Sequence, residues 1–197
     1  MRMMKKILLI VLGMVSLDLY AQDSQVMTQE FTKYTQLMLD KKFNEGMEYM
    51  NPGIFEMASR EQLVAVMEQT FNNPELEIEM AMPELAAFSE TKKIEDKFYI
   101  KFKTISVIKM RFNSIIKAEK TAEENQAAIN MVKENLTTKL GAENVSYDEQ
   151  TRFFTLKSVK PVIASSTDKK AWKFITVDNE SQKAMLEKFI PKELLID

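Results

Sequence analysis

The stretch Phe98–Phe112, FYIKFKTISVIKMRF, constrains the fold more than any other part of the chain. Lysines, an arginine and a tyrosine alternate in it with apolar residues, which are Phe98, Ile100, Phe102, Ile108, Met110 and Phe112. Successive side chains of a β-strand point to opposite faces. The pattern therefore predicts one long strand, with one face under a layer of helices and the other face solvated and basic.

Residues 1–21 have the features of a secretory signal peptide. Met1–Lys6 is basic, Ile7–Val15 is apolar, and Leu19–Ala21 is a suitable cleavage site. Asp18 interrupts the apolar run too early for a membrane anchor, which needs about 20 apolar residues. We expect export to the periplasm or medium of a Gram-negative-type bacterium, and one α+β domain over residues 22–197.

Composition excludes several classes of function. Cleavage would remove Arg2, Lys5, Lys6 and Asp18 and leave 24 basic and 28 acidic residues, a net charge of −4. A mildly acidic domain is a poor candidate for sequence-independent binding to nucleic acid. The chain has no cysteine and no histidine. Disulfides, thiolate metal sites, thiol catalysis and histidine acid/base chemistry are therefore ruled out.

Helical periodicity and helix caps lie on both sides of the central stretch. Ser59 and Gln62 form one capping box, with Leu63, Val66, Met67 and Phe71 as the apolar stripe behind it. Thr121 and Glu124 form another, and Gly141 is a natural stop. The expected helices are Ser24–Asp40, Phe43–Met50, Ser59–Phe71, Thr121–Leu140 and Ser181–Phe189.

Shorter alternating or apolar segments complete a sheet. The expected strands are Leu76–Met82, Leu85–Ile94, Val145–Tyr147, Arg152–Lys160 and Ala171–Val177. Pro161 should interrupt the fourth of these, and acids of the first should pair with basic residues of the central strand. Short links between strands imply antiparallel pairing. The predicted class is α+β: a curved antiparallel sheet with N-terminal helices packed on its concave face and one inserted helix between strands.

Three features resemble the nuclear-transport-factor-two-like superfamily, the cone-shaped fold of ketosteroid isomerase and polyketide cyclases. The helix Thr28–Leu39 runs into LDKKFNEGMEYMNP, the strand pair Leu85–Phe112 follows, and Ala171–Thr176 resembles the closing strand of that group. The added helix Thr121–Leu140 is similar to that of small exported Gram-negative proteins of no assigned role. The resemblance implies a cone that can hold a ligand, but such a fold hosts many functions.

A ligand-binding cavity is the first candidate site. Thr104 and Ser106 interrupt the apolar row of the central strand, and Tyr34 lies on the apolar stripe of the first helix. The resemblance to ketosteroid isomerase implies that a first-helix tyrosine reaches the cavity, and a few polar groups in an apolar pocket suit a small molecule. The competing interpretation is a bulge whose hydroxyls bond to backbone. Trp172, the single tryptophan, is a further candidate contact or, more simply, a structural anchor.

Catalysis and metal binding have weaker support in the sequence. An isomerase-like enzyme needs an inward carboxylate, and the central strand offers none, which leaves Asp40 and Glu84 without an identified partner. The chain has fifteen methionines, and Met47 with Met50, or Met80 with Met82, could offer thioethers to Cu(I). Methionine is also a ready core filler. We expect no cofactor and no metal.

The expected partner is a small apolar ligand or another protein, with no nucleic acid and no membrane after signal cleavage. A homodimer through the solvent face of the sheet, where Tyr99, Ile105 and Val107 stand among lysines, is a further possibility. Non-catalytic binding is the favoured function; a cone-fold enzyme and a purely structural dimerisation domain are the alternatives.

Overall fold

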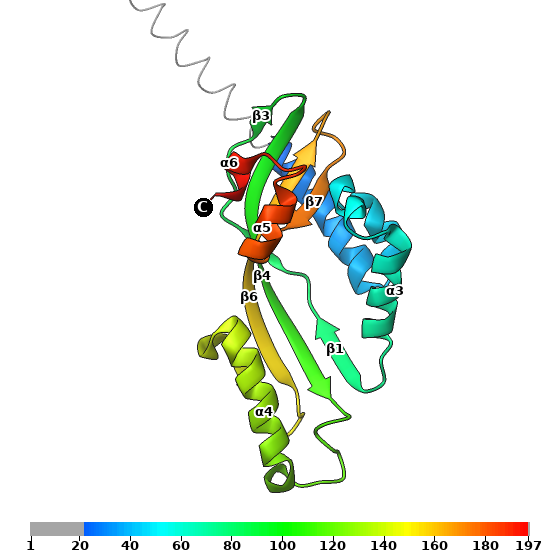
Figure 1. Cartoon of the computed structure of the whole chain (residues 1–197), viewed down its shortest axis with the longest axis vertical. Helices are drawn as coiled ribbons and strands as arrows, with labels where there is room; N and C mark the ends of the chain where they lie inside the picture. Colours follow the sequence, from blue (N-terminus) through cyan, green and yellow to red (C-terminus); the bar gives the residue numbers. More distant parts are fainter. Residues whose placement is uncertain (1–21, 197) are drawn as a thin grey trace, which may run out of the picture.

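Two long strands form the axis of the molecule (Figure 1). The computed structural model describes residues 22–196, so the predicted signal peptide lies outside the described residues. Strand β4, Lys97–Phe112, pairs antiparallel with β6, Phe154–Ser166. Their register is continuous from Phe98 opposite Ser166 to Met110 opposite Phe154. The long central strand is thus confirmed, and the bulge considered at Thr104 and Ser106 is absent from this ladder.

Shorter strands flank the two long ones and complete an open, antiparallel, seven-stranded sheet within residues 22–196. The free edge of β4 pairs in turn with β3, β2 and β1, and that of β6 with β7 and β5. Their bounds are Leu76–Met80 for β1, Glu84–Ala86 for β2, Lys92–Ile94 for β3, Val145–Tyr147 for β5 and Lys173–Thr176 for β7. Between these pairings the sheet is only two strands wide, at residues 106–107 of β4 and 157–158 of β6, a region we call the waist.

The N-terminal helix, residues 22–39, covers the apolar face of β4. Its Met27 and Phe31 pack with Phe102, Trp172 and Phe174 in a core above the waist. Three short elements and one longer helix follow it and pack beside it. The short elements are α2 (Phe43–Gly46) and the 3₁₀ turns η1 (Met47–Tyr49) and η2 (Pro52–Glu56), and the longer helix is α3 (Arg60–Phe71). The α+β class, with N-terminal helices preceding the sheet, is therefore as predicted.

Both predicted capping boxes are present. Ser59 Oγ accepts from Gln62 N at the start of α3, and Thr121 Oγ1 accepts from Glu124 N at the start of α4, Ala122–Leu140. Gly141 ends α4 with φ +89°, a conformation that favours glycine. The stripe predicted on α3 is wrong at one position, since Val64 is buried and Val66 is exposed.

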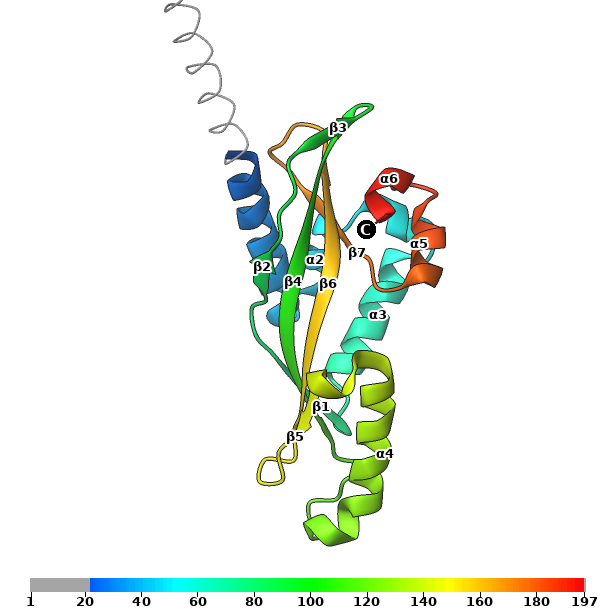
Figure 2. The ribbon, with the colours of Figure 1, turned by 90° about the vertical axis from the view of Figure 1, so that its left-hand side faces the viewer.

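The opposite face of the sheet is covered above the waist, which the sequence analysis did not predict (Figure 2). Helices α5, Glu180–Leu186, and α6, Lys192–Leu195, lie across it. Leu186, Ile190, Leu194 and Leu195 pack there against sheet residues that include Tyr99, which is only 4% exposed. The prediction that Tyr99 faces solvent is therefore wrong, because the C-terminal segment supplies a second apolar layer.

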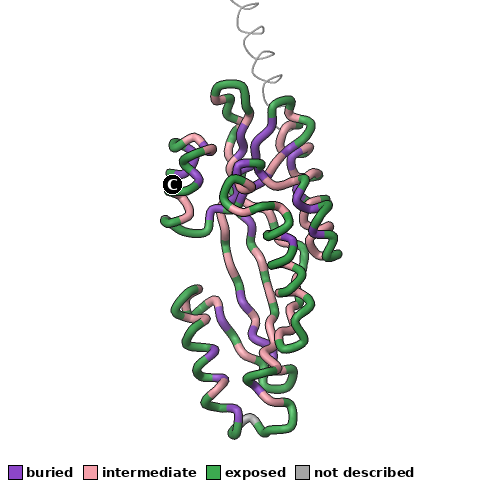
Figure 3. Tube along the Cα trace, turned by 45° about the vertical axis from the view of Figure 1, so that its right-hand side comes forward, coloured by how far each residue is buried: buried purple, intermediate pink, exposed green. Residues whose placement is uncertain are grey.

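A separate core lies below the waist. Ile129 and Val132 of α4 pack there against Phe154 and Leu156 of β6. Figure 3 shows buried residues gathered in the upper half of the molecule and again toward its lower end. The waist therefore joins two packed regions.

Two strand predictions need correction. The segment Leu85–Ile94 is two strands, because Ala87 turns the chain with φ +54° and Ser89 then bonds to Lys101. Strand β6 also continues through Pro161. The Pro161 carbonyl accepts from Val177 N at 2.9 Å, so the missing N–H of Pro161 faces the same outer edge and the ladder to β4 keeps its hydrogen bonds.

The predicted charge pairing across the sheet is present. On the solvent face Glu77 pairs with Arg111, and Glu79 lies 3.9 Å from Lys109. The partners stand directly opposite in the register of β1 and β4. Exposed pairs of this kind contribute little stability and mainly favour the register.

Candidate ligand-binding cleft

A cleft of about 470 Å³ opens over the waist, on the face covered by the N-terminal helix. Its floor consists of small hydroxyl side chains from the two long strands: Thr104, Ser106 and Ser158. Ser106 and Ser158 stand directly opposite each other in the register of β4 and β6. Large side chains fill this face above and below, at Phe102 and Phe154. The cleft is open because the side chains between them are small.

The walls of the cleft are apolar and come from segments far apart in the sequence. The lining comes from the N-terminal helix, the link between η1 and η2, α3, β1 and the link between β1 and β2. Its large side chains include Phe31, Met38, Met50, Phe71, Met80 and Pro83. Methionines are prominent in the wall, and their flexible thioether chains adapt to irregular shapes. An apolar lining with a few polar groups, in a space of this size, is typical of small-molecule sites.

Tyr34 is one of the polar groups at the cleft. Its ring stacks on Phe174, with centroids 5.9 Å apart, and contacts Phe31 edge-on at the same separation. Burial raises the pKa of Tyr34 to about 12. The phenol therefore stays protonated at neutral pH and can donate a hydrogen bond.

The floor hydroxyls differ in their hydrogen bonds. Thr104 Oγ1 lies 3.4 Å from the Lys160 carbonyl oxygen, a long bond to backbone of the kind the competing interpretation expected. Within the part of the chain that the structure describes, the hydroxyls of Ser106 and Ser158 have no hydrogen-bond partner. Both are therefore available to a ligand or to water.

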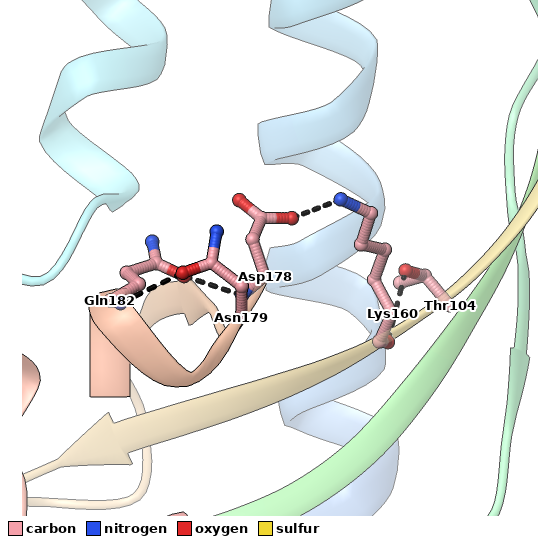
Figure 4. Close-up of polar contacts among 5 residues, drawn as sticks. All are labelled: Thr104, Lys160, Asp178, Asn179 and Gln182. Carbon is pink, nitrogen blue, oxygen red and sulfur yellow. Dashed lines mark hydrogen bonds and ion pairs between the residues drawn. The ribbon is translucent and has the colours of Figure 1, made fainter. Parts of the chain in front are cut away.

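An ion pair lies at one end of the cleft, where β6, β7 and α5 meet (Figure 4). The Lys160 ammonium forms an ion pair with Asp178. The Asp178 N–H donates to Gln182 Oε1, and the Gln182 N–H donates to Asn179 Oδ1 at 2.9 Å. Lys160 and Asp178 are the only charged side chains among the described residues that line the cleft.

Three of the four predicted contacts, Tyr34, Thr104 and Ser106, lie around this one cleft. Trp172 does not. It is 1% exposed in the upper core, and its Nε1 donates to the Lys169 carbonyl at 3.1 Å. The anchor interpretation describes its position.

Asp40 and Glu84, the carboxylates left open by the sequence, are both exposed and outside the cleft lining. Sequence reasoning missed Ser158, Lys160, Asp178 and Gln182. Ser158 and Lys160 continue the alternation of Phe154 and Leu156, so the pattern held a signal for two of them.

The predicted methionine pairs each divide between two environments. Met47 is fully buried in a core with Phe43, whereas Met50 lines the cleft. Met80 also lines the cleft, whereas Met82 is exposed. Residues 22–196 contain no group of three or more histidine, cysteine, aspartate or glutamate side chains that could hold a metal ion.

Comparison of the chain with protein-family models, with curated proteins and with solved structures finds no match. Across residues 22–196 no helix has both the length and the apolar character needed to cross a membrane.

Proposed function

We propose that this protein binds a small, largely apolar ligand in the cleft over the waist and does not transform it. The supporting observation is the position of Tyr34, Thr104 and Ser106, three polar side chains around one apolar space of about 470 Å³. Cavities of roughly 300–1,000 Å³ with this mixture of lining groups are the usual sites for small ligands. The absence of histidine and cysteine from the chain favours binding over chemistry.

The proposal is tested with a neutral fluorophore, N-phenylnaphthylamine, and two matched substitutions. Ser106→Phe places a ring on the cleft floor, whereas Val107→Phe places the same ring on the opposite, exposed face of the same strand. We expect probe fluorescence to rise when the wild-type protein or Val107→Phe is added. The apparent affinity of Ser106→Phe for the probe should be lower than that of the wild type by about tenfold or more. Thermal unfolding of each variant controls for folding. Equal binding by all three proteins, or none by the wild type, would overturn the proposal.

A proton-transfer enzyme of the ketosteroid isomerase type is the second candidate function. Membership of the nuclear-transport-factor-two-like superfamily, which the sequence resembles, is proposed with it. One observation favours it: the Asp178 carboxylate and the Tyr34 phenol line the same cleft. Asp178 is ion-paired with Lys160, which favours a structural part for it. Ligand extracted from native protein should be recovered unchanged after prolonged incubation; turnover that Tyr34→Phe and Asp178→Asn both abolish would establish the enzyme instead.

We also propose that the protein is exported and that residues 1–21 are removed. The basic and apolar pattern of that segment supports this. Mass spectrometry of protein from a periplasmic or culture fraction should find Gln22 as the first residue. An uncleaved chain in the cytoplasmic fraction would contradict export.

A dimer through the solvent face is a third possibility, with a smaller surface than expected. Tyr99 is buried, but Val107 at the waist and Ile105 and Val159 next to it remain exposed. Native mass spectrometry of protein from its natural compartment separates the cases. A monomer with retained ligand mass supports binding in the cleft, and a clean dimer without added mass supports the structural alternative.

A further inference from the structure

We propose that the ligand of the cleft is an amphiphile with an apolar body and a single carboxylate, and that Lys160 binds the carboxylate by exchanging Asp178 for it. This inference rests on the proposed function and adds the chemical class of the ligand.

The charged groups of the cleft are gathered at one end. Lys160 and Asp178 are 37% and 41% exposed, whereas the rest of the described lining is uncharged and largely apolar. A ligand that fills the cleft therefore meets apolar side chains and hydroxyls along its body and one ion pair at its end. Only an end group of the ligand can contact both the cleft and this pair.

Hydrogen bonding at that end favours an anion. The Gln182 oxygen already accepts from the Asp178 N–H, so the free end of this side chain is its Nε2 donor. Within residues 22–196, this nitrogen has no hydrogen-bond partner. Figure 4 shows it turned to the same side as the Lys160–Asp178 pair. Two donors, the Lys160 ammonium and the Gln182 amide nitrogen, thus lie at this end of the cleft, where the Asp178 carboxylate is the only anionic group of the described lining. Charge-assisted bonds to a carboxylate are among the stronger ones.

Asp178 occupies the place that we assign to the ligand carboxylate. Lys160 comes from the floor strand β6, beside Ser158 and opposite Thr104, whereas Asp178 lies in the link between β7 and α5. An exposed ion pair contributes little stability, so Asp178 can turn to solvent when another carboxylate takes its place. The exchange replaces one ion pair by another and leaves no buried charge without a partner.

The experiment compares three fluorescent probes with one apolar body: dansylated undecanoic acid, its methyl ester and the corresponding dansylated amine. We expect the wild-type protein to bind the acid about tenfold more tightly than the ester at low salt, and the amine least tightly. Lys160→Gln keeps much of the side-chain length and removes the charge, so it should bring the acid to the affinity of the ester. Asp178→Asn removes the competing carboxylate and should tighten the acid alone. Lys157→Gln, on the same strand but exposed on the opposite face, should bind as the wild type does.

The outcomes separate this inference from the proposed function. If the acid and the ester bind equally and Ser106→Phe binds neither, the inference of a carboxylate ligand is overturned and the proposed apolar binding site is kept. The amine bound more tightly than the acid would overturn it in favour of a cation at Asp178. None of the three probes bound would overturn the proposed function itself. Should Lys160→Gln fail to fold, the comparison of acid and ester on the wild-type protein decides alone.

Discussion

Leu186→Ala tests the C-terminal layer, the part of the fold that the sequence pattern did not predict. Leu186 lies on α5, is fully buried and packs with Ile190 and Leu194 in the core that includes Tyr99. Removing its three outer carbons costs about 2.4 kcal/mol in transfer free energy at about 0.8 kcal/mol per methylene. A residual cavity raises the cost, and measured Leu→Ala changes span about 2–5 kcal/mol. Because α5 is short and peripheral, it can partly close the cavity, and we expect about 3 kcal/mol.

The assay is urea unfolding followed by fluorescence. Trp172, the single tryptophan, lies in the upper core on the other side of the sheet and therefore reports on unfolding of the packed region above the waist. With a urea dependence of about 2 kcal/mol per molar, a loss of about 3 kcal/mol lowers the midpoint by about 1.5 M. The matched control is Met185→Ala, the neighbouring residue of the same helix, which is 41% exposed and should change stability by less than about 0.5 kcal/mol. Indistinguishable urea midpoints for the two variants would refute the apolar layer formed by the C-terminal segment.

Four further predictions concern other parts of the chain. Thr121→Ala removes the cap of α4 and should cost about 1 kcal/mol in urea unfolding. Gly53→Ala places a Cβ 2.2 Å from the Phe189 ring and should cost about 1–3 kcal/mol, of which Phe189→Ala in the same chain should recover part. Burial raises the pKa of Tyr34 to about 12, so the stability that its protonated phenol contributes is complete below pH 10 and is lost as the pH rises to about 12. Tyr34→Phe should remove this loss from a plot of Tm against pH. Iodide should quench Trp172 weakly in the folded protein and strongly in urea, because this side chain is 1% exposed.

Local patterns predicted what depends on local physics. The alternation in Phe98–Phe112 identified β4, and the capping boxes at Ser59 and Thr121 located the starts of two helices within one residue. Side-chain alternation also placed Thr104 and Ser106 on the covered face, because register within a strand follows from its period of two. These inferences needed no knowledge of which segments meet.

Features that depend on distant segments were missed. The apolar residues near the C-terminus predict a helix but not the face of the sheet that it covers, so Tyr99 was assigned to solvent. The continuation of β6 through Pro161 depends on which edge its nitrogen faces, and β7 determines that edge. The Lys160–Asp178 pair joins residues 18 positions apart on either side of the β6–β7 turn. The sequence around a charged residue near a predicted strand does not indicate such an ion-pair partner.

Stability and the proposed function conflict at the waist. Here the sheet is two strands wide, and Ser106 faces Ser158 where a pair of β-branched side chains would pack better and bring the two cores closer. Two serines are a poor choice for strength in the narrowest part of the sheet. They leave a largely apolar space with a hydroxyl floor, and hydroxyls that are open to solvent can be hydrated instead of being packed over. The side chains that weaken the sheet are therefore the same ones that open the cleft, and this coincidence is our reason for assigning the ligand to the waist and not to either packed region.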